Sequence, residues 1–395
     1  MATRAVEIAS TPTAQIGGRV MRVLLVTLPG DGHFHPLLRL ATALRSAGHE
    51  LLFATSRPYV PDVRRTGFDA VGAGPDFRWD SAVERWPDCV NHMGSAGLAY
   101  WALTINQDVT TPLVRDLLRV IDDWKPGLVI AEYATTAAAM ILRECRAVPV
   151  LMTAWGDEPS SPTFLQHTAL GLEACRSEFG LGPWNGELPG DRWLAFTPTT
   201  WARVDGEPLA ETLRASPYSR ESSIARAAPQ APFVYATLGT IYGTTRKLLR
   251  AFIQALELGN LYGLVTVGRN NDPNAFAHSE AVEVEQFVDQ RQVLPRASAV
   301  LCHGGFGTLM GALAEGVPSV VVPLGADQIS NAEHVRRLGV GIVVEPADAT
   351  PVRLQQSLEE VISSSRYRAA CEDLMAEIAS MPSPSSVVAD MELLR

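Results

Sequence analysis

The stretch Cys302-His303-Gly304-Gly305-Phe306-Gly307-Thr308 follows an apolar run from Ala297 to Leu301. The apolar run predicts a buried strand, and the glycines predict a tight turn into a helix that opens at Thr308. The first turn of a helix has unpaired N–H groups and a positive dipole end, and glycines let a phosphate approach the backbone closely. With the His303 imidazole as a further donor, this stretch indicates a site for a phosphate-rich ligand.

A second segment is expected beside this turn. Ser319 to Val322 is another short apolar run, and it is followed by Asp327-Gln328. In open α/β sheets ligands bind outside the carboxyl ends of the strands, so both loops should face one crevice. Glycine clusters also occur in turns that bind nothing, and it is the longer pattern that favours a binding site.

These segments resemble the nucleotide-sugar box of GT-B glycosyltransferases in the plant and bacterial UDP-glycosyltransferase superfamily. The chain looks closest to the actinobacterial enzymes that glycosylate polyketides and other natural products. The resemblance implies an α/β fold of two Rossmann-like, doubly wound parallel-sheet domains that face each other across a cleft. The residues that it assigns to donor binding here are His303, Gly304, Gly305, Gly307, Thr308, Asp327 and Gln328.

Composition sets limits on the class of protein. The chain has 395 residues, 47% of them hydrophobic, and a net charge of −10. A nucleic-acid backbone needs a basic face, so this acidic chain is not expected to bind nucleic acid. The five scattered cysteines include no Cys-x-x-Cys pair, which argues against disulfide staples and structural zinc. No apolar run could span a bilayer and no signal-peptide core is evident, so we expect a cytoplasmic protein with no membrane partner.

The first half opens with an apolar run from Arg22 to Leu28, which predicts a buried parallel strand. Residues 1–20 show no period and predict a flexible extension. Pro29-Gly30-Asp31-Gly32-His33 breaks the strand, and leucines at helical spacing up to Gly48 predict a helix. His33 is therefore expected at the mouth of a doubly wound sheet.

His33 has three interpretations. A neutral imidazole at this place can accept a proton near pH 7, whereas a histidine that caps the following helix would do no chemistry. His33-x-His35 also imitates a pair of metal ligands, although no third ligand is evident. The segment Gly32-His33-Phe34-His35-Pro36-Leu37 resembles the family's Gly-His-x-x-Pro-Leu. In many members that histidine is the general base, and the resemblance assigns this role to His33.

A carboxylate ends another predicted strand of this half. Leu128 to Ala131 is apolar and leads directly to Glu132. Such a glutamate could orient the His33 imidazole and stabilise its protonated form, or it could be an exposed loop residue. Family members place an acidic residue here, more often aspartate, so the resemblance implies that Glu132 is the partner of His33.

Several aromatic residues lie in a poorly periodic segment between Asp76 and Tyr100. Aromatic side chains usually belong to a core, but a cluster of them can also line an apolar pocket. The candidates for acceptor binding are Trp79, Trp86 and Tyr100, together with Trp155, which follows the end of a predicted strand.

The two halves are joined by a stretch rich in Pro, Gly, Ser and Trp from Gly182 to Pro232, which is typical of linkers and binding loops. We place the acceptor domain at residues 21–218 and the donor domain at residues 219–380. Residues 381–395 form a final helix, which in the family often packs back on the first domain.

Further donor contacts are implied by the resemblance. The family's Leu-Gly-Ser/Thr loop assigns diphosphate binding to Thr240, and its Trp-x-Pro-Gln stretch assigns contact with the nucleotide base to Phe287 and Val288. Asp289, in place of the usual proline, is a departure. Gly311 is another, because relatives that use UDP-sugars often carry a glutamate there that binds the ribose hydroxyls. A 2′-deoxyribose loses nothing by its absence, so we expect a dTDP-linked donor.

These residues predict an inverting, metal-independent glycosyltransferase. It would move a (deoxy)sugar from a dTDP-sugar or other NDP-sugar to a hydroxyl of an apolar natural-product aglycone. The chain has no Asp-x-Asp pair, so no metal is expected, and no other cofactor. The expected partners are the donor and the acceptor, and a homodimer is left open. One alternative is a catalytically silent homologue that binds a nucleotide sugar or metabolite and assists a partner enzyme. A dehydrogenase is disfavoured because no Gly-x-Gly-x-x-Gly follows the first strand.

Overall fold

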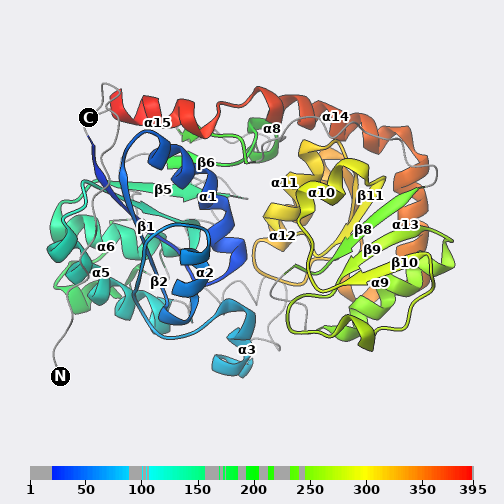
Figure 1. Cartoon of the computed structure of the whole chain (residues 1–395), viewed down its shortest axis with the longest axis horizontal. Coiled ribbons are helices and arrows are strands. Elements are labelled where there is room, and N and C mark those ends of the chain that lie inside the picture. Colours follow the sequence, from blue (N-terminus) through cyan, green and yellow to red (C-terminus); the bar gives the residue numbers. More distant parts are fainter. Residues whose placement is uncertain are drawn as a thin grey trace.

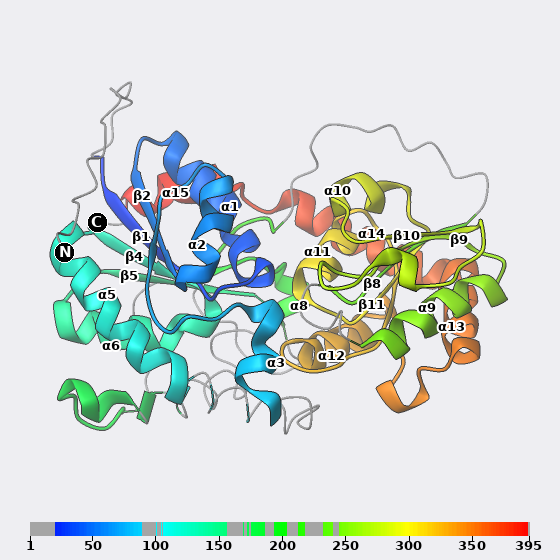
Figure 2. The ribbon, with the colours of Figure 1, turned by 60° about the horizontal axis from the view of Figure 1, so that its bottom comes forward.

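The computed structural model describes residues 20–88, 106–155, 175–185, 193–203, 212–217, 232–239 and 245–393, with a few isolated positions between 100 and 173. Two α/β domains lie side by side, and both views show them as separate bodies (Figures 1 and 2). Thr240 and nearly all of the predicted N-terminal extension lie outside the described residues. The predicted architecture of two doubly wound parallel sheets is confirmed.

The first domain is built on a parallel sheet in which seven strands are described, in the order β3-β2-β1-β4-β5-β6-β7. Its central strands are apolar throughout because helices cover both faces. Leu25 of β1 packs with α1, whereas its neighbour Leu24 packs with α5 and α6. The strands are β1 (Arg22–Val26), β2 (Glu50–Thr55), β3 (Ala70–Gly72), β4 (Leu128–Ala131), β5 (Val150–Ala154), β6 (Trp193–Ala195) and β7 (Thr212–Arg214), and the helices include α1 (Asp31–Ser46), α2 (Val60–Arg65), α3 (Ala82–Arg85), α5 (Thr111–Trp124), α6 (Thr136–Arg146) and α8 (Thr199–Ala202).

The second domain repeats this plan with six described strands in the order β10-β9-β8-β11-β12-β13. All of their pairings are parallel. The strands are β8 (Phe233–Thr237), β9 (Tyr262–Thr266), β10 (Val282–Glu285), β11 (Ala299–Cys302), β12 (Ser319–Val321) and β13 (Gly341–Val343), and the helices include α9 (Arg246–Leu258), α10 (Gln290–Val293), α11 (Phe306–Ala314), α12 (Gln328–Leu338), α13 (Pro351–Ser363) and α14 (Ser365–Ser380). Helix α15 (Pro384–Leu393) follows this domain.

Each sheet has one place where the strand order reverses. In the first sheet β1 lies beside β4, and in the second β8 lies beside β11. Chain segments leave such a pair of strands in opposite directions and open a crevice at their carboxyl ends, which is where α/β proteins bind ligands. The segments that follow these four strands therefore occupy the two natural binding positions of the fold.

The chain after the second domain returns to the first. Ser216 of the first domain donates its N–H to the carbonyl of Pro382 at 3.0 Å. Helix α15 then packs on α1, with Val387 and Val388 each 2% exposed (Figure 1). The helix that carries His33 is thus covered by the last helix of the chain.

Two expectations need correction. Part of the predicted linker, residues 193–214, contains β6, α8 and β7, which extend the first sheet. Strands of three residues are too short to show a period, and Trp193 and Leu194 are in fact buried. The helix expected after His33 begins instead at Asp31, so His33 lies in its first turn.

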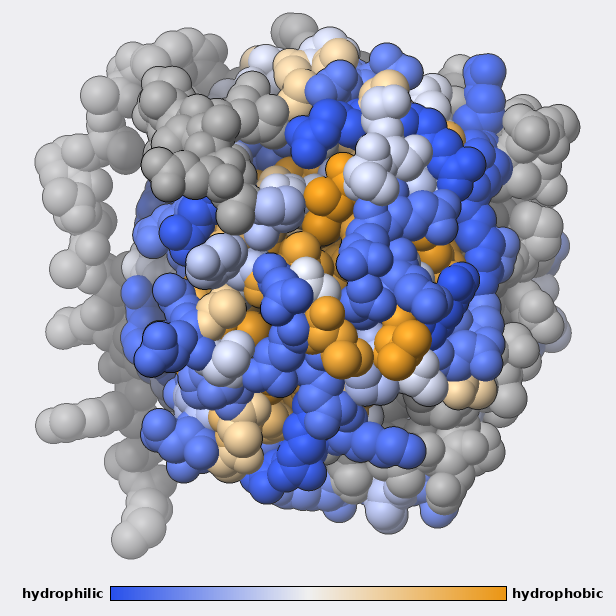
Figure 3. Space-filling view, turned by 90° about the vertical axis from the view of Figure 1, so that its right-hand side faces the viewer, coloured by the Kyte–Doolittle hydropathy of each residue, from blue (hydrophilic) through white to orange (hydrophobic). Residues whose placement is uncertain are grey.

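The end of the second domain that faces away from the first is mostly hydrophilic, with apolar residues in small groups (Figure 3). Leu258 and Val352 are among the exposed apolar residues, and they line a shallow groove between α9 and α13. This groove is remote from the four strand ends described above.

Candidate active site

His33 and Glu132 meet at the crevice of the first sheet. Glu132 follows β4 directly, and α1 starts five residues after β1 with His33 in its first turn. The N–H groups of His33 and Phe34 both donate to the carbonyl of Gly30 at 3.0 Å, which fixes that turn. His33 Nδ1 lies 3.3 Å from Glu132 Oε2.

The backbone holds the Glu132 carboxylate in place. Its Oε1 accepts the N–H of Leu28 at 3.2 Å, and its Oε2 accepts the N–H of Ala134 at 2.9 Å. The residue is fully buried, so the interpretation of Glu132 as an exposed loop residue is wrong. A buried carboxylate fixed by two donors can orient an imidazole without moving itself.

The protonation equilibrium of His33 depends on both domains. Burial lowers the pKa of His33, but the charge and hydrogen bond of Glu132 and the charge of Asp327 together raise it above its ordinary value. The imidazole is 18% exposed, so it is reachable from the cleft. Helix α1, which carries His33, contacts α11 of the second domain.

Two of the four aromatic candidates flank His33. The Trp79 ring lies 5.5 Å from the imidazole, centre to centre and edge to face, and the Trp155 ring lies 6.5 Å from it. Gly30 makes room for Trp79, since a Cβ at Gly30 would come within 2.8 Å of the Trp79 Cβ. An apolar surface therefore borders the imidazole on two sides, and it is almost fully covered, because Trp79 is only 8% and Trp155 only 6% exposed.

The other two candidates lie behind this surface. The Trp86 ring is 6.2 Å from that of Trp79, and its N–H donates to Asp108 Oδ2 at 2.8 Å. Tyr100 packs on the same cluster and is partly buried. The sequence could not separate these residues from Trp79, because all of them lie in the same irregular segment.

In the second domain, the turn after β11 has the predicted form with one shift. Helix α11 begins at Phe306, with Gly305 as its N-cap, so it opens two residues before Thr308. Gly304 has φ +87°, and a Cβ there would lie 2.7 Å from Val321 Cγ1. Both facts require glycine at this position.

His303 is buried beneath the turn. A Cβ at Gly305 would come within 2.6 Å of its Nε2, and one at Gly239, after β8, within 2.9 Å. Burial lowers the pKa of His303 to about 4, against the opposing effect of a hydrogen bond with the backbone of Thr237. The imidazole is therefore neutral at pH 7, and its one N–H is the donor in the hydrogen bond with the backbone of Thr237.

Asp327 and Gln328 are engaged with the loops around the turn. Asp327 Oδ2 accepts the N–H of Phe306 at 3.2 Å and the Asn331 side-chain N–H at 2.9 Å, and Asn331 also donates to the carbonyl of Gly304. Gln328 Oε1 accepts the N–H groups of Leu324 and Gly325. The Gln328 oxygen is thus used within its own loop, and the predicted sugar contact would fall to its amide nitrogen.

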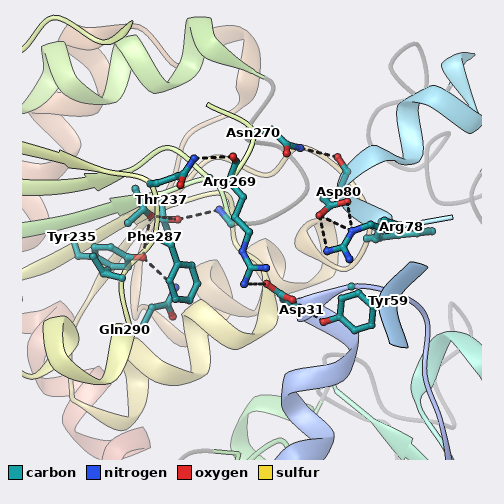
Figure 4. Close-up of a pocket in the computed structure, with 17 residues that line it drawn as sticks. Asp31, Tyr59, Arg78, Asp80, Tyr235, Thr237, Arg269, Asn270, Phe287 and Gln290 are labelled. Atoms are coloured by element: carbon teal, nitrogen blue, oxygen red, sulfur yellow. Dashed lines mark hydrogen bonds and ion pairs between the residues drawn. The ribbon is translucent and has the colours of Figure 1, made fainter. Parts of the chain in front are cut away.

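A pocket lies between the domains, and Phe287 and Val288 line it on the second-domain side (Figure 4). Phe287 is 53% exposed, so its ring is available for stacking. Beneath it, Gln290 donates to Thr308 Oγ1 at 3.1 Å and lies 3.4 Å from the Tyr235 hydroxyl. The lining from the first domain is Gly30, Asp31, Tyr59, Arg78, Trp79 and Asp80, and that from the second includes Tyr235, Thr237, Gly239, Thr266, Gly268, Arg269, Asn270, Gln286 and Gln290.

A group of charged residues in this pocket was not predicted from the sequence. Arg269 Nη2 lies 3.2 Å from Asp31 Oδ2, and the Tyr59 hydroxyl donates to Asp31 Oδ1 at 2.7 Å. Arg269 and Asp31 both follow strand ends, which is the only signal the sequence offers for them. Their contact joins two segments that are more than two hundred residues apart.

The described part of the chain contains neither a cluster of metal ligands nor a membrane-spanning helix. No group of three or more His, Cys, Asp or Glu side chains among those residues is placed to hold a metal ion. Nor does any helix within the described ranges have the length and apolar character needed to cross a membrane.

Two doubly wound parallel-sheet domains are the architecture of glycosyltransferases of the GT-B type, and solved structures of such enzymes superpose on this chain. The chain belongs to the erythromycin biosynthesis protein CIII-like family of such enzymes. The N-terminal domain model of that family matches residues 42–193, and the C-terminal domain model matches residues 262–394.

The relatives agree with this assignment. L-demethylnoviosyl transferase of Streptomyces niveus is 27% identical, with 93% of this chain and 96% of the relative covered. Aklavinone 7-beta-L-rhodosaminyltransferase of Streptomyces galilaeus is 26% identical, with 95% and 96% covered. Among solved structures, the calicheamicin glycosyltransferase CalG4 superposes with a TM-score of 0.78 at 21% identity, covering 95% of this chain and 98% of its own. The last comparison supports the fold alone.

Proposed function

We propose that this protein is an inverting glycosyltransferase that moves a (deoxy)sugar from a dTDP-linked donor to a hydroxyl of an apolar natural-product aglycone. The similar proteins named above are transferases of natural-product sugars, which supports sugar transfer to an aglycone. The observation that carries the proposal is the His33–Glu132 pair, held by the backbone and directed at the crevice of the second domain.

In the proposed reaction, neutral His33 removes the proton of the acceptor hydroxyl while its oxygen attacks the anomeric carbon. The bond from that carbon to the diphosphate oxygen breaks in the same step, so the configuration inverts. Glu132 stabilises the imidazolium that forms, as the orienting carboxylate of a base does elsewhere. No step of the proposed reaction requires a metal. Glu132 balances the positive charge that forms on His33, and backbone N–H groups stabilise the negative charge that forms on the diphosphate.

The departing diphosphate is proposed to lie at the amino end of α11. The N–H groups of Gly304, Gly305 and Gly307 would stabilise its charge. Thr308 is proposed to contribute its hydroxyl, because its N–H donates to the carbonyl of Gly305 at 3.1 Å. His303 is proposed to support the donor site from beneath Gly305, because its one N–H is already held by the backbone of Thr237. Thr240 is proposed to contact the same group.

The donor base is proposed to stack on Phe287, beside the backbone of Val288. Gly311, which is buried on α11, leaves no carboxylate to bind a 2′-hydroxyl. Two structurally similar proteins, VinC and the spinosyn rhamnosyltransferase SpnG, were solved with thymidine diphosphate. We therefore expect dTDP to bind more tightly than UDP in a calorimetric titration. A clear preference for UDP would remove the dTDP assignment and leave the rest of the mechanism standing.

The acceptor is proposed to lie on Trp79 and Trp155, whose rings border the imidazole. An apolar aglycone would cover this surface and exclude water from the reacting centre. Asp327 and Gln328 are proposed to hold hydroxyls of the sugar from the other side.

The test is mass spectrometry of reactions with a panel of nucleotide sugars and hydroxylated polyketides, followed by NMR of the anomeric configuration. The active combination should yield acceptor plus one sugar with an inverted anomeric centre. Replacing His33 by Ala should lower turnover by about 10²–10⁴-fold while dTDP binding persists. His35→Ala is the matched control, since His35 is an exposed residue of the same helix. Unchanged turnover in His33→Ala would refute the base assignment, and donor binding without transfer to any acceptor would favour a silent homologue.

A further inference from the structure

Arg269 reaches across the cleft to the helix that carries His33. It follows the carboxyl end of β9 in the second domain, and its guanidinium lies 3.2 Å from Asp31 Oδ2 and 3.6 Å from Asp62 Oδ1 of the first domain. Asp31 stands two residues before His33 in the first turn of α1. Figure 4 shows the Arg269 side chain extended toward Asp31 over the pocket.

Both ends of this contact are held in place. The Gln286 side-chain amide donates to the carbonyl of Arg269 at 2.8 Å, and the Asn270 side-chain amide donates to the carbonyl of Asp80 in the first domain at 3.1 Å. On the other side, the Tyr59 hydroxyl donates to Asp31. The contact is therefore part of a fixed bridge between the domains.

The same guanidinium borders the proposed donor site. Its central carbon lies 5.6 Å from the centre of the Phe287 ring, on which the nucleotide base is proposed to stack. The Arg269 side chain is 43% exposed, whereas that of Asp31 is 11% exposed. A group that covers this pocket would remove water from Arg269, and a partly desolvated ion pair is stronger than one in water.

We propose that Arg269 is a positioning residue that couples occupation of the donor pocket to the placement of His33. This proposal rests on the proposed function and deepens it. A nucleotide base stacked on Phe287 shields the Arg269 guanidinium from water. The ion pair with Asp31 then becomes stronger and fixes the first turn of α1. The imidazole is then held against the anomeric carbon, so losing the pair should affect turnover more than donor affinity.

The first experiment compares Arg269→Gln with the wild type. We expect kcat to fall by roughly two- to ten-fold and the Kd for dTDP to rise by a smaller factor, because an ion pair that donor binding strengthens must also strengthen donor binding. Arg269→Lys keeps the positive charge but lacks the planar set of N–H donors of a guanidinium. It should therefore recover part of the lost kcat. Arg336→Gln is the matched control, because Arg336 pairs with Glu333 and Glu345 within its own domain. Wild-type kcat should fall toward that of Arg269→Gln as salt rises to about 0.5 M, while Arg269→Gln itself stays nearly flat.

The second experiment asks whether Arg269 acts through Asp31. Asp31→Asn should cause a similar loss of kcat, and the double variant should lose little more than either single one. Losses that multiply, or an Arg269→Gln enzyme with the kcat and salt profile of the wild type, would overturn the proposal while leaving sugar transfer intact.

A third measurement does not depend on turnover. Arg269→Glu places a negative charge opposite Asp31 and Asp62, so the domains should separate. Small-angle scattering should then give a larger radius of gyration than for the wild type or Arg336→Gln. Unchanged scattering by Arg269→Glu would count against the bridge even if no transferase activity were found for the wild type.

Discussion

At the scale of single residues, the position of Glu132 explains how one imidazole can take up a proton in a buried place. Burial alone would lower the pKa of His33 and weaken it as a base. The charge and hydrogen bond of Glu132, with the charge of Asp327, reverse that effect and leave the pKa of His33 above its ordinary value. One of the two carboxylates belongs to the first domain and the other to the second.

This arrangement predicts the pH dependence of kcat/KM. A protonated imidazole cannot accept a proton, so activity should rise as pH increases through the raised pKa of His33, above the range of an ordinary histidine. Glu132→Gln removes the charge that raises this pKa, and the acid limb should therefore move to lower pH. Its plateau should fall by about 10²–10⁴-fold because the imidazolium loses its partner.

The control for this variant is Glu132→Asp. It keeps the charge, so the acid limb should stay nearer to that of the wild type even if the shorter side chain lowers the rate. The Gln amide nitrogen would also face a backbone N–H of Leu28 or Ala134, so circular dichroism must show that the variant folds. An acid limb that does not move in folded Glu132→Gln would contradict the role of Glu132 in setting the base.

At the scale of elements, the glycine turn between β11 and α11 is the part of the site most dependent on backbone shape. Gly304→Ala adds a Cβ 2.7 Å from Val321 Cγ1 at a φ of +87°. The left-handed conformation costs about 1–2 kcal/mol, and the overlap adds roughly 1–3 kcal/mol. We expect a lower melting temperature and weaker dTDP binding, measured by calorimetry.

Gly339→Ala separates the cost of the left-handed conformation from the cost of steric overlap. Gly339 also has a positive φ, +64°, but a Cβ there would meet nothing within 4 Å. Its loss of stability should be limited to the conformational cost, and its dTDP affinity should stay that of the wild type. Equal losses of stability and dTDP affinity in the two variants would show that the contact between Gly304 and Val321 does not determine the shape of the turn.

The same elements show how far the sequence could predict the site. The central strands β1, β4, β8 and β11 are continuous apolar runs, and functional residues could be placed at their ends by the geometry of parallel sheets alone. The pairing of His33 with Glu132 followed from that rule and from the family resemblance. The short strands β3, β6 and β7 could not be predicted, because three residues are too few to show a periodic pattern of apolar side chains.

The bridge made by Arg269 could not be predicted at all. Neither Arg269 nor Asp31 stands in a distinctive motif, and their contact depends on how the two domains meet. The same is true of Trp86, which no pattern distinguishes from Trp79 although only Trp79 borders the imidazole. Strand ends can be read from local sequence, whereas contacts between domains depend on the whole structure.

At the scale of the whole molecule, the chain crosses between the domains more than once, and the last crossing ends on α1, the helix that carries His33. Val387 and Val388 of α15 share a core with Leu37 and Leu40 of α1. Replacing both valines by Ala removes buried methyl groups worth about 2–4 kcal/mol together, so the first domain should melt roughly 5–10 °C lower. Because α1 then loses its outer support, kcat should fall, while the affinity for dTDP, which we propose to bind to the second domain, should stay unchanged.

Val352→Ala is the control for this pair, since Val352 is 54% exposed on α13. It should change neither melting nor turnover. Calorimetry of the double variant has two informative results. A lower transition together with reduced kcat and normal dTDP binding supports α15 as a brace for the catalytic helix. An unchanged melting temperature would mean that the packing of α15 on α1 adds little stability. The position of His33 relative to the glycine turn would then depend on the contacts across the cleft.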